Sequence, residues 1–90
     1  MTQTILIGGQ TAIVGLEADG FFVARFEDGN FYRTDNETDA TNVARARLNN
    51  LAGTAALADE SIPENRRAER AAAFFRAAVI NTPGRVIGGA

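Results

Sequence analysis

The sequence has no cysteine, no histidine and no lysine, and these absences remove most of the side chains that enzymes use. Proton shuttles that work at neutral pH and activated nucleophiles are drawn mainly from those residue types. Ser61 is explained as a helix cap, and the carboxylates cluster in a solvated loop with no apolar pocket to raise a pKa. We therefore expect a chain that is not an enzyme and that needs no cofactor and no small-molecule substrate.

Long hydrophobic runs are missing as well. No apolar stretch approaches the ~20 residues that span a bilayer, and no basic region leads into a signal sequence at the N-terminus. Without cysteine the chain can form neither disulfides nor thiolate metal sites, which suits a reducing compartment. Asp35, Glu37 and Asp39 lack the spacing of an EF-hand, so we expect no metal site. These features predict a cytoplasmic protein that does not associate with membranes.

The aromatic residues gather in one stretch, residues 20–34, which holds four of the six phenylalanines and the only tyrosine. Asp28-Gly29 lies between two aromatic runs, a pattern typical of a β-hairpin with a two-residue type I′ turn. Such a turn pairs Phe26 with Phe31.

This register sorts the aromatic side chains of the hairpin. Because side chains alternate along a strand, Phe22, Phe26 and Phe31 are expected to share the core face. Arg25 then pairs with Tyr32 on the opposite face and lies over its ring.

Two earlier turns extend the hairpin into a meander. Gly8-Gly9 separates two β-branched runs and predicts a first hairpin. Ala18-Asp19-Gly20 suits a three-residue loop, in which a type I turn is closed by a glycine in the left-handed region. This loop sets Leu16 opposite Phe22, Val14 opposite Ala24 and Ala12 opposite Phe26.

Two helices are expected in the alanine-rich part of the chain. Asn36 or Thr38 is the predicted N-cap of the first helix, and Gly53 its C-cap. Ser61-Ile62-Pro63-Glu64 has the form of a capping box and opens a second helix that ends at about Ile80. The tail that follows is either a short edge strand or loose.

The predicted fold class is α+β: a four-stranded antiparallel β-meander followed by two α-helices packed on one face of the sheet. Ninety residues suffice for one modest core. We therefore expect a single domain over residues 1–90, with the meander in 1–34, the helical layer in 35–84 and the C-terminal tail in 85–90.

The net charge of −2 conceals an uneven distribution. Residues 17–39 carry seven acids and two arginines, and the rest of the chain is slightly basic. A rigid sheet that presents such acids can steer towards a basic groove on a protein partner. The residues predicted to form this partner-binding surface are Glu27, Asp28, Asp35, Glu37 and Asp39.

A second interpretation starts from the basic residues, all of which are arginine. Arginines on a helical surface can bind the phosphates of DNA or RNA. The residues predicted for this alternative are Arg66, Arg67, Arg70 and Arg76, with Arg45 and Arg47. A third interpretation is a homo-oligomeric structural protein, because Arg67 and Phe74 lie towards the apolar side of the second helix and allow a homodimer contact.

In outline, the chain resembles the small inhibitors that phages and mobile elements encode, including anti-CRISPR proteins. The resemblance lies in the compact acidic α+β domain, the Asp28-Gly29 hairpin, the acidic loop from Asp35 to Asp39, the helices rich in alanine and arginine, and the lack of a catalytic set. It implies a protein that blocks a nucleoprotein complex by occupying its surface.

Overall fold

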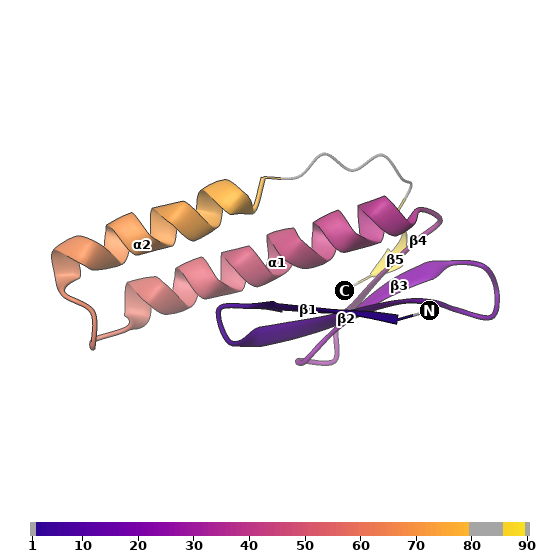
Figure 1. Cartoon of the computed structure of the whole chain (residues 1–90), viewed down its shortest axis with the longest axis horizontal. Coiled ribbons are helices and arrows are strands. Elements are labelled where there is room, and N and C mark those ends of the chain that lie inside the picture. Colours follow the sequence, from indigo (N-terminus) through magenta and orange to yellow (C-terminus); the bar gives the residue numbers. More distant parts are fainter. Residues whose placement is uncertain (1, 80–85, 90) are drawn as a thin grey trace.

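The computed structural model describes residues 2–79 and 86–89, and it describes side chains for residues 2–79. It contains, in chain order, β1 (Thr2–Ile7), β2 (Gln10–Leu16), β3 (Phe22–Phe26), β4 (Phe31–Thr34), α1 (Glu37–Ala58), α2 (Glu64–Ala77) and β5 (Val86–Gly89). The strands form one antiparallel sheet in the order β1-β2-β3-β4-β5 (Figure 1).

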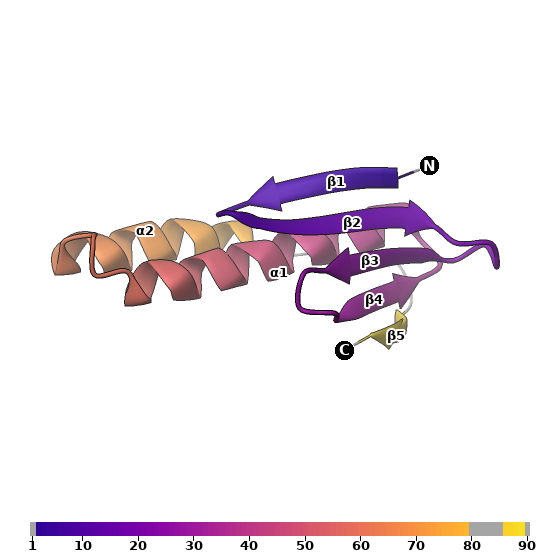
Figure 2. The same ribbon diagram turned by 90° about the horizontal axis from the view of Figure 1, so that it is seen from below.

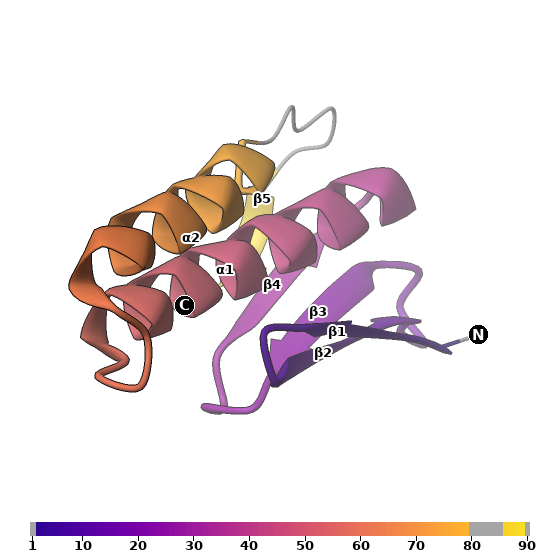
Figure 3. The ribbon, with the colours of Figure 1, turned by 60° about the vertical axis from the view of Figure 1, so that its left-hand side comes forward.

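The predicted fold class is confirmed: four antiparallel strands in chain order precede two helices, and a helix packs on the sheet. The tail is a strand rather than loose chain, because β5 pairs with β4 and becomes an edge of the sheet. Of the helices in the described part of the chain, only α1 contacts β1 to β4, whereas α2 packs along α1 (Figure 3). A single helix, α1, therefore covers the sheet, and α2 packs against the side of that helix.

The first two turns have the predicted form. Gly8 and Gly9 both have positive φ, and they join β1 to β2 so that Ile7 pairs with Gln10. The loop between β2 and β3 is closed by a hydrogen bond from the Gly20 N–H to the Glu17 carbonyl oxygen, at 3.0 Å. The predicted pairs between β2 and β3 are all present, namely Leu16 with Phe22, Val14 with Ala24 and Ala12 with Phe26.

The turn between β3 and β4 differs from the predicted two-residue turn. The Phe26 N–H donates to the Asn30 carbonyl oxygen at 3.0 Å, and the Gly29 N–H donates to the Phe26 carbonyl oxygen at 3.1 Å. Gly29 has a φ of 90°, and among the described residues every positive φ belongs to a glycine. Asp28 therefore cannot occupy a type I′ position, and residues 27–29 form a type I turn closed by glycine, like residues 18–20.

The additional loop residue shifts the pairing by one, so the predicted register of this hairpin is wrong. Arg25 pairs with Phe31, and Ala24 pairs with Tyr32. A shift by one residue moves every side chain of β4 to the other face. Phe31 thus leaves the core face and is 39% exposed, while Tyr32 and Thr34 join that face. The predicted contact of Arg25 with the Tyr32 ring is wrong for the same reason.

The core lies between α1 and the inner face of the sheet. Ala40, Ala44 and Leu48 recur at helical spacing on α1 and are fully buried. They pack on a surface formed by Ile5, Ala12, Val14, Ala24 and Phe26. The alanines allow the helix to approach the strands closely. Because α1 has 22 residues, its C-terminal end extends beyond the sheet, together with α2 (Figure 2).

The first helix is longer than predicted. Asn36 is its N-cap, with its side-chain oxygen accepting a hydrogen bond from the Asp39 N–H at 3.0 Å, but Gly53 is not its C-cap. Gly53 lies inside the helix, where a Cβ atom would come within 2.6 Å of the Phe75 ring. The glycine serves close packing of α2 on α1, and the helix continues to Ala58.

The second helix begins differently from the prediction. Pro63 occupies the N-cap position and makes no side-chain capping hydrogen bond, so the capping box at Ser61 is wrong. The Ser61 hydroxyl instead donates to Asp59 at 2.6 Å. The helix ends at Ala77, and the predicted end at Ile80 lies outside the described residues.

Candidate protein-interaction site

The sheet has one face covered by α1 and one face that no described element covers (Figure 2). The register places Thr4, Ile13, Arg25 and Phe31 side by side across β1 to β4 on this outer face. Leu6 follows Thr4 on the same face of β1, because alternate residues of a strand share a face. We call these five residues the outer patch.

The outer patch is unusually apolar for a solvent-exposed surface. Leu6 is 68% exposed and Ile13 is 46% exposed, and Phe31 adds an exposed ring. Scattered exposed apolar residues are normal, but here three large ones lie on one sheet face. Leu6 and Ile13 lie on neighbouring strands, and Phe31 lies two strands from Ile13 with Arg25 between them. Exposed apolar side chains that gather on one face mark interaction sites. The outer patch is therefore the first candidate for a binding surface.

Beyond the outer patch, around Val23 and Arg33, side chains of the outer face cover one another and leave little apolar surface exposed. The Arg33 guanidinium lies 4.1 Å from the centre of the Phe21 ring and forms an ion pair with Asp19. Val23 pairs with Arg33 across the strands and is only 4% exposed although it points away from α1. The exposed apolar surface is therefore confined to the half that contains the outer patch.

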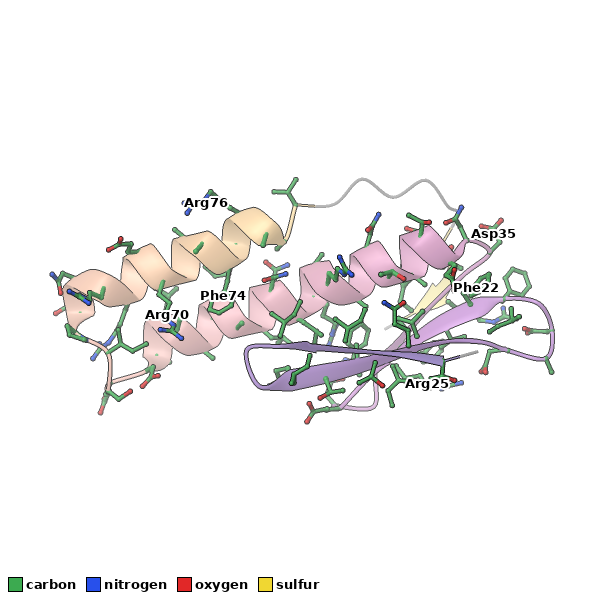
Figure 4. The ribbon with its side chains drawn as sticks, viewed as in Figure 1. Phe22, Arg25, Asp35, Arg70, Phe74 and Arg76 are labelled. Atoms are coloured by element: carbon green, nitrogen blue, oxygen red, sulfur yellow. The ribbon has the colours of Figure 1, made fainter. Side chains whose placement is uncertain are left out.

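The charges on the outer face are neutralised locally. Arg25 forms an ion pair with Glu17 at 2.6 Å, on the side of the sheet away from the helices (Figure 4). Arg33 and Asp19 form the second such pair. Each of these two arginines is therefore matched by a carboxylate.

The five predicted acidic residues do not form one surface, and one of them, Asp39, is buried. Asp39 has no exposed surface: its carboxylate accepts hydrogen bonds from the Tyr32 hydroxyl at 2.9 Å and from the Thr34 hydroxyl at 2.7 Å. The carboxylate of Asp39 thus joins β4 to α1 and lies below the surface, away from the other predicted partner-binding residues.

The four remaining acids lie at two places. Glu27 and Asp28 belong to the β3–β4 turn, whereas Asp35 and Glu37 lie where β4 leads into α1, so the length of β4 separates the pairs. Glu27 is engaged with the backbone, since its carboxylate accepts a hydrogen bond from the Thr11 N–H at 2.6 Å. These acids therefore form no single patch.

Asp28 is also engaged within the protein. Its carboxylate forms an ion pair with Arg47 of α1 at 2.7 Å. The hydrogen bond from the Asn30 N–H, and secondly the Arg47 guanidinium, hold the pKa of Asp28 below its usual range. The Arg47 guanidinium also lies 4.8 Å from the centre of the Phe26 ring, so this arginine serves the helix–sheet contact.

The arginines of α2 do not form one surface. The Arg67 side chain donates to the Ile62 carbonyl oxygen at 2.8 Å and is partly buried. Arg76 lies on the side of α2 that faces away from α1 (Figure 4). Arg66 and Arg70 line one shallow groove together with Glu69, which reduces its positive charge. The structure thus brings together two of the four arginines predicted for nucleic-acid binding.

The described residues contain neither a candidate metal site nor a candidate membrane span. Within residues 2–79 and 86–89, no group of three or more acidic, histidine or cysteine side chains could hold a metal ion. In the same part of the chain, no helix combines the length and the apolar character needed to cross a bilayer.

Sequence reasoning missed the outer patch, although a signal was present. Ile5-Leu6-Ile7 and Ala12-Ile13-Val14 are continuous apolar runs, which are typical of strands covered on both faces. A strand covered on one face normally alternates apolar and polar residues. These runs therefore indicated a second apolar face.

Comparison with known proteins gives no family for the chain. It matches no protein-family model, and no curated protein or solved structure is significantly similar to it.

Proposed function

We propose that the chain is a non-enzymatic protein-binding module that holds its partner against the outer patch. The observation that carries this proposal is that β1, β2 and β4 each present a large apolar side chain, Leu6, Ile13 and Phe31, on the face of the sheet that the helices leave uncovered in the described part of the chain. Burial of apolar surface is the main favourable contribution to most protein associations, and the exposed side chains of Leu6, Ile13 and Phe31 provide it.

The chemistry of the outer face specifies the kind of partner. A surface for DNA or RNA needs cations that are free to contact phosphates. On this face Arg25 and Arg33 are each matched by a carboxylate. The partner we propose is therefore a protein with an exposed apolar surface.

The narrower role of a phage-type, anti-CRISPR-like inhibitor remains a proposal that rests on the resemblance in outline. In that role the outer patch would occupy a surface of a nucleic-acid-binding complex. The acids at the two ends of β4, Asp28, Asp35 and Glu37, would then contribute long-range steering rather than the contact itself.

The proposal is tested by capturing partners on the immobilised chain from an extract of the cells that encode it. The outer-patch variant Ile13→Thr/Phe31→Thr keeps β-forming residues and removes two exposed apolar side chains. The matched control is Leu57→Gln, which removes an exposed leucine near the end of α1. We expect the outer-patch variant to lose a partner that wild type and control both retain. Equal capture by all three, with unchanged thermal unfolding, would contradict the proposal.

A further inference from the structure

The second edge of β1 carries no strand in the part of the chain that the structure describes. Soluble proteins usually protect such edges with charged residues, proline, a β-bulge or a covering segment. β1 has the sequence Thr-Gln-Thr-Ile-Leu-Ile, without charge or proline, and pairs with β2 in an unbroken register. This edge is thus open to pairing with another strand.

The register shows which backbone groups face this edge. Ile7 and Gln10 close the two-residue turn, and in such a hairpin the closing pair exchanges hydrogen bonds. Hydrogen-bonded and non-hydrogen-bonded pairs then alternate along an antiparallel ladder. It follows that Thr2, Thr4 and Leu6 direct their N–H and C=O groups away from β2.

We propose that β1 pairs antiparallel with β1 of a second copy of the chain, with Thr4 on the two-fold axis. In this register all three outward-facing residues find partners, because Thr4 meets Thr4 of the second copy and Thr2 meets Leu6. A register centred on Ile5 would pair only Thr4 with Leu6 and would bring Thr2 against Gly8. The Thr4-centred arrangement therefore pairs more of the backbone N–H and C=O groups that face this edge.

A second copy suits this edge because the strand is compatible with itself. An isologous contact sets each residue against its symmetry mate, so any charge near the axis would face a like charge. β1 has none. Hydroxyl side chains meet at the centre of the outer face, which is a favourable cross-strand pair.

The dimer has a consequence for the outer patch. A two-fold axis perpendicular to the sheet keeps both α1 helices on one side and both outer patches on the other. Leu6 lies beside the axis, so the two patches become one continuous surface. This consequence rests on the proposed function, whereas the pairing of the strands does not. Because one strand edge is a small interface, we expect reversible dimerisation that depends on protein concentration.

The experiment is sedimentation analysis over a range of concentrations with a charge-exchange pair, Thr4→Lys and Thr4→Glu. Thr4 is exposed, so the isolated subunit accommodates either side chain. Wild type is expected to approach twice its mass of 9.6 kDa at high concentration. Each variant alone should remain monomeric, and an equimolar mixture should recover the dimer. Ala77→Lys, at an exposed position in the last turn of α2, is the matched control and should dimerise like wild type.

Three results would overturn the proposal: a monomeric wild type at all concentrations, dimers of either variant alone, or a mixture that stays monomeric. Thermal unfolding of both variants verifies that the subunit is folded. The outcome is independent of partner capture. A monomeric wild type that still binds a partner through Ile13 and Phe31 would refute the dimer and leave the proposed function standing.

Discussion

The Tyr32 hydroxyl donates a hydrogen bond to the Asp39 carboxylate at 2.9 Å, and this contact fastens the first turn of α1 to β4. Thr34 donates to the same carboxylate oxygen at 2.7 Å. Both strand residues point to the inner face only because β4 is shifted by one residue from the predicted register. The length of the β3–β4 turn sets the register of β4, and this register determines both the position of Phe31 on the outer face and the burial of Asp39.

The first prediction concerns stability at high pH. Burial, followed by the hydrogen bond to Asp39 and its negative charge, raises the pKa of Tyr32 from 10.0 to about 12. The folded state therefore retains the phenolic proton in a range where the unfolded state loses it. This contribution to the free energy of unfolding is complete below pH 10 and is lost as the pH rises towards 12. We expect stability to fall across that range.

The Tyr32→Phe variant provides the control, because the sequence has no lysine or cysteine to titrate in the same range. Chemical unfolding at several pH values should give a flat profile for the variant where wild type declines. Ultraviolet absorbance reports the phenol directly, since Tyr32 is the only tyrosine. Parallel profiles for the two proteins would show that the hydroxyl is not linked to folding.

The second prediction separates a structural acid from a surface acid. Asp39→Ala leaves the part-buried hydroxyl of Tyr32 and the buried hydroxyl of Thr34 without this acceptor, so we expect a loss of about 2–4 kcal/mol in the free energy of unfolding. Glu37→Ala changes an exposed position and should cost at most about 0.5 kcal/mol. Denaturant titration measures both values. Equal, small losses would mean that Asp39 does not hold β4 to α1.

The third prediction concerns the turn between β1 and β2. Gly8 and Gly9 both have positive φ, but a Cβ atom at Gly8 would lie 2.5 Å from the Ala52 Cβ atom, whereas one at Gly9 would meet nothing within 4 Å. Both alanine substitutions strain the backbone by about 1–2 kcal/mol. Gly8→Ala should cost a further ~1–3 kcal/mol from overpacking against α1.

A double substitution identifies the cause of that additional loss. Adding Ala52→Gly removes the atom that Gly8→Ala would strike, so the two changes should be less destabilising together than their separate effects predict. Thermal or denaturant unfolding of the single and double variants gives the interaction energy. Strictly additive effects would contradict the contact between the turn and α1.

The fourth prediction tests the acidic binding mode. Asp28→Arg/Glu37→Arg reverses one accessible acid at each end of β4. If the outer patch makes the contact, partner capture should persist, with a change confined to the association rate and its dependence on salt. Abolished capture by this variant, together with full capture by Ile13→Thr/Phe31→Thr, would restore the acidic surface as the binding site.

The fifth prediction tests the nucleic-acid alternative. Because Glu69 accompanies Arg66 and Arg70 in their groove, we expect no shift of a DNA or RNA duplex in a gel assay even at about 50 mM salt. A salt-sensitive shift that disappears in Arg66→Ala/Arg70→Ala would instead establish that alternative.

The sequence by itself determined the α+β order of elements and the location of the turns, because glycine and its neighbours limit the local backbone. It also determined the register between β2 and β3. The loop at residues 27–29 could have been predicted from residues 17–21, which share the Asp-Gly step. In both loops the aspartate side chain accepts a hydrogen bond from the N–H two residues later, at 3.1 Å and 3.0 Å.

Only the tertiary structure decided which side chains remain exposed. Whether Gly53 ends a helix or admits the Phe75 ring depends on α2, and the burial of Asp39 depends on two hydroxyls of β4. Local propensity carries no information on either contact, because each joins segments that meet only after folding. The same holds for Leu6, Ile13 and Phe31. The sequence shows that these residues are apolar, but they remain exposed because α1 covers only the opposite face of the sheet.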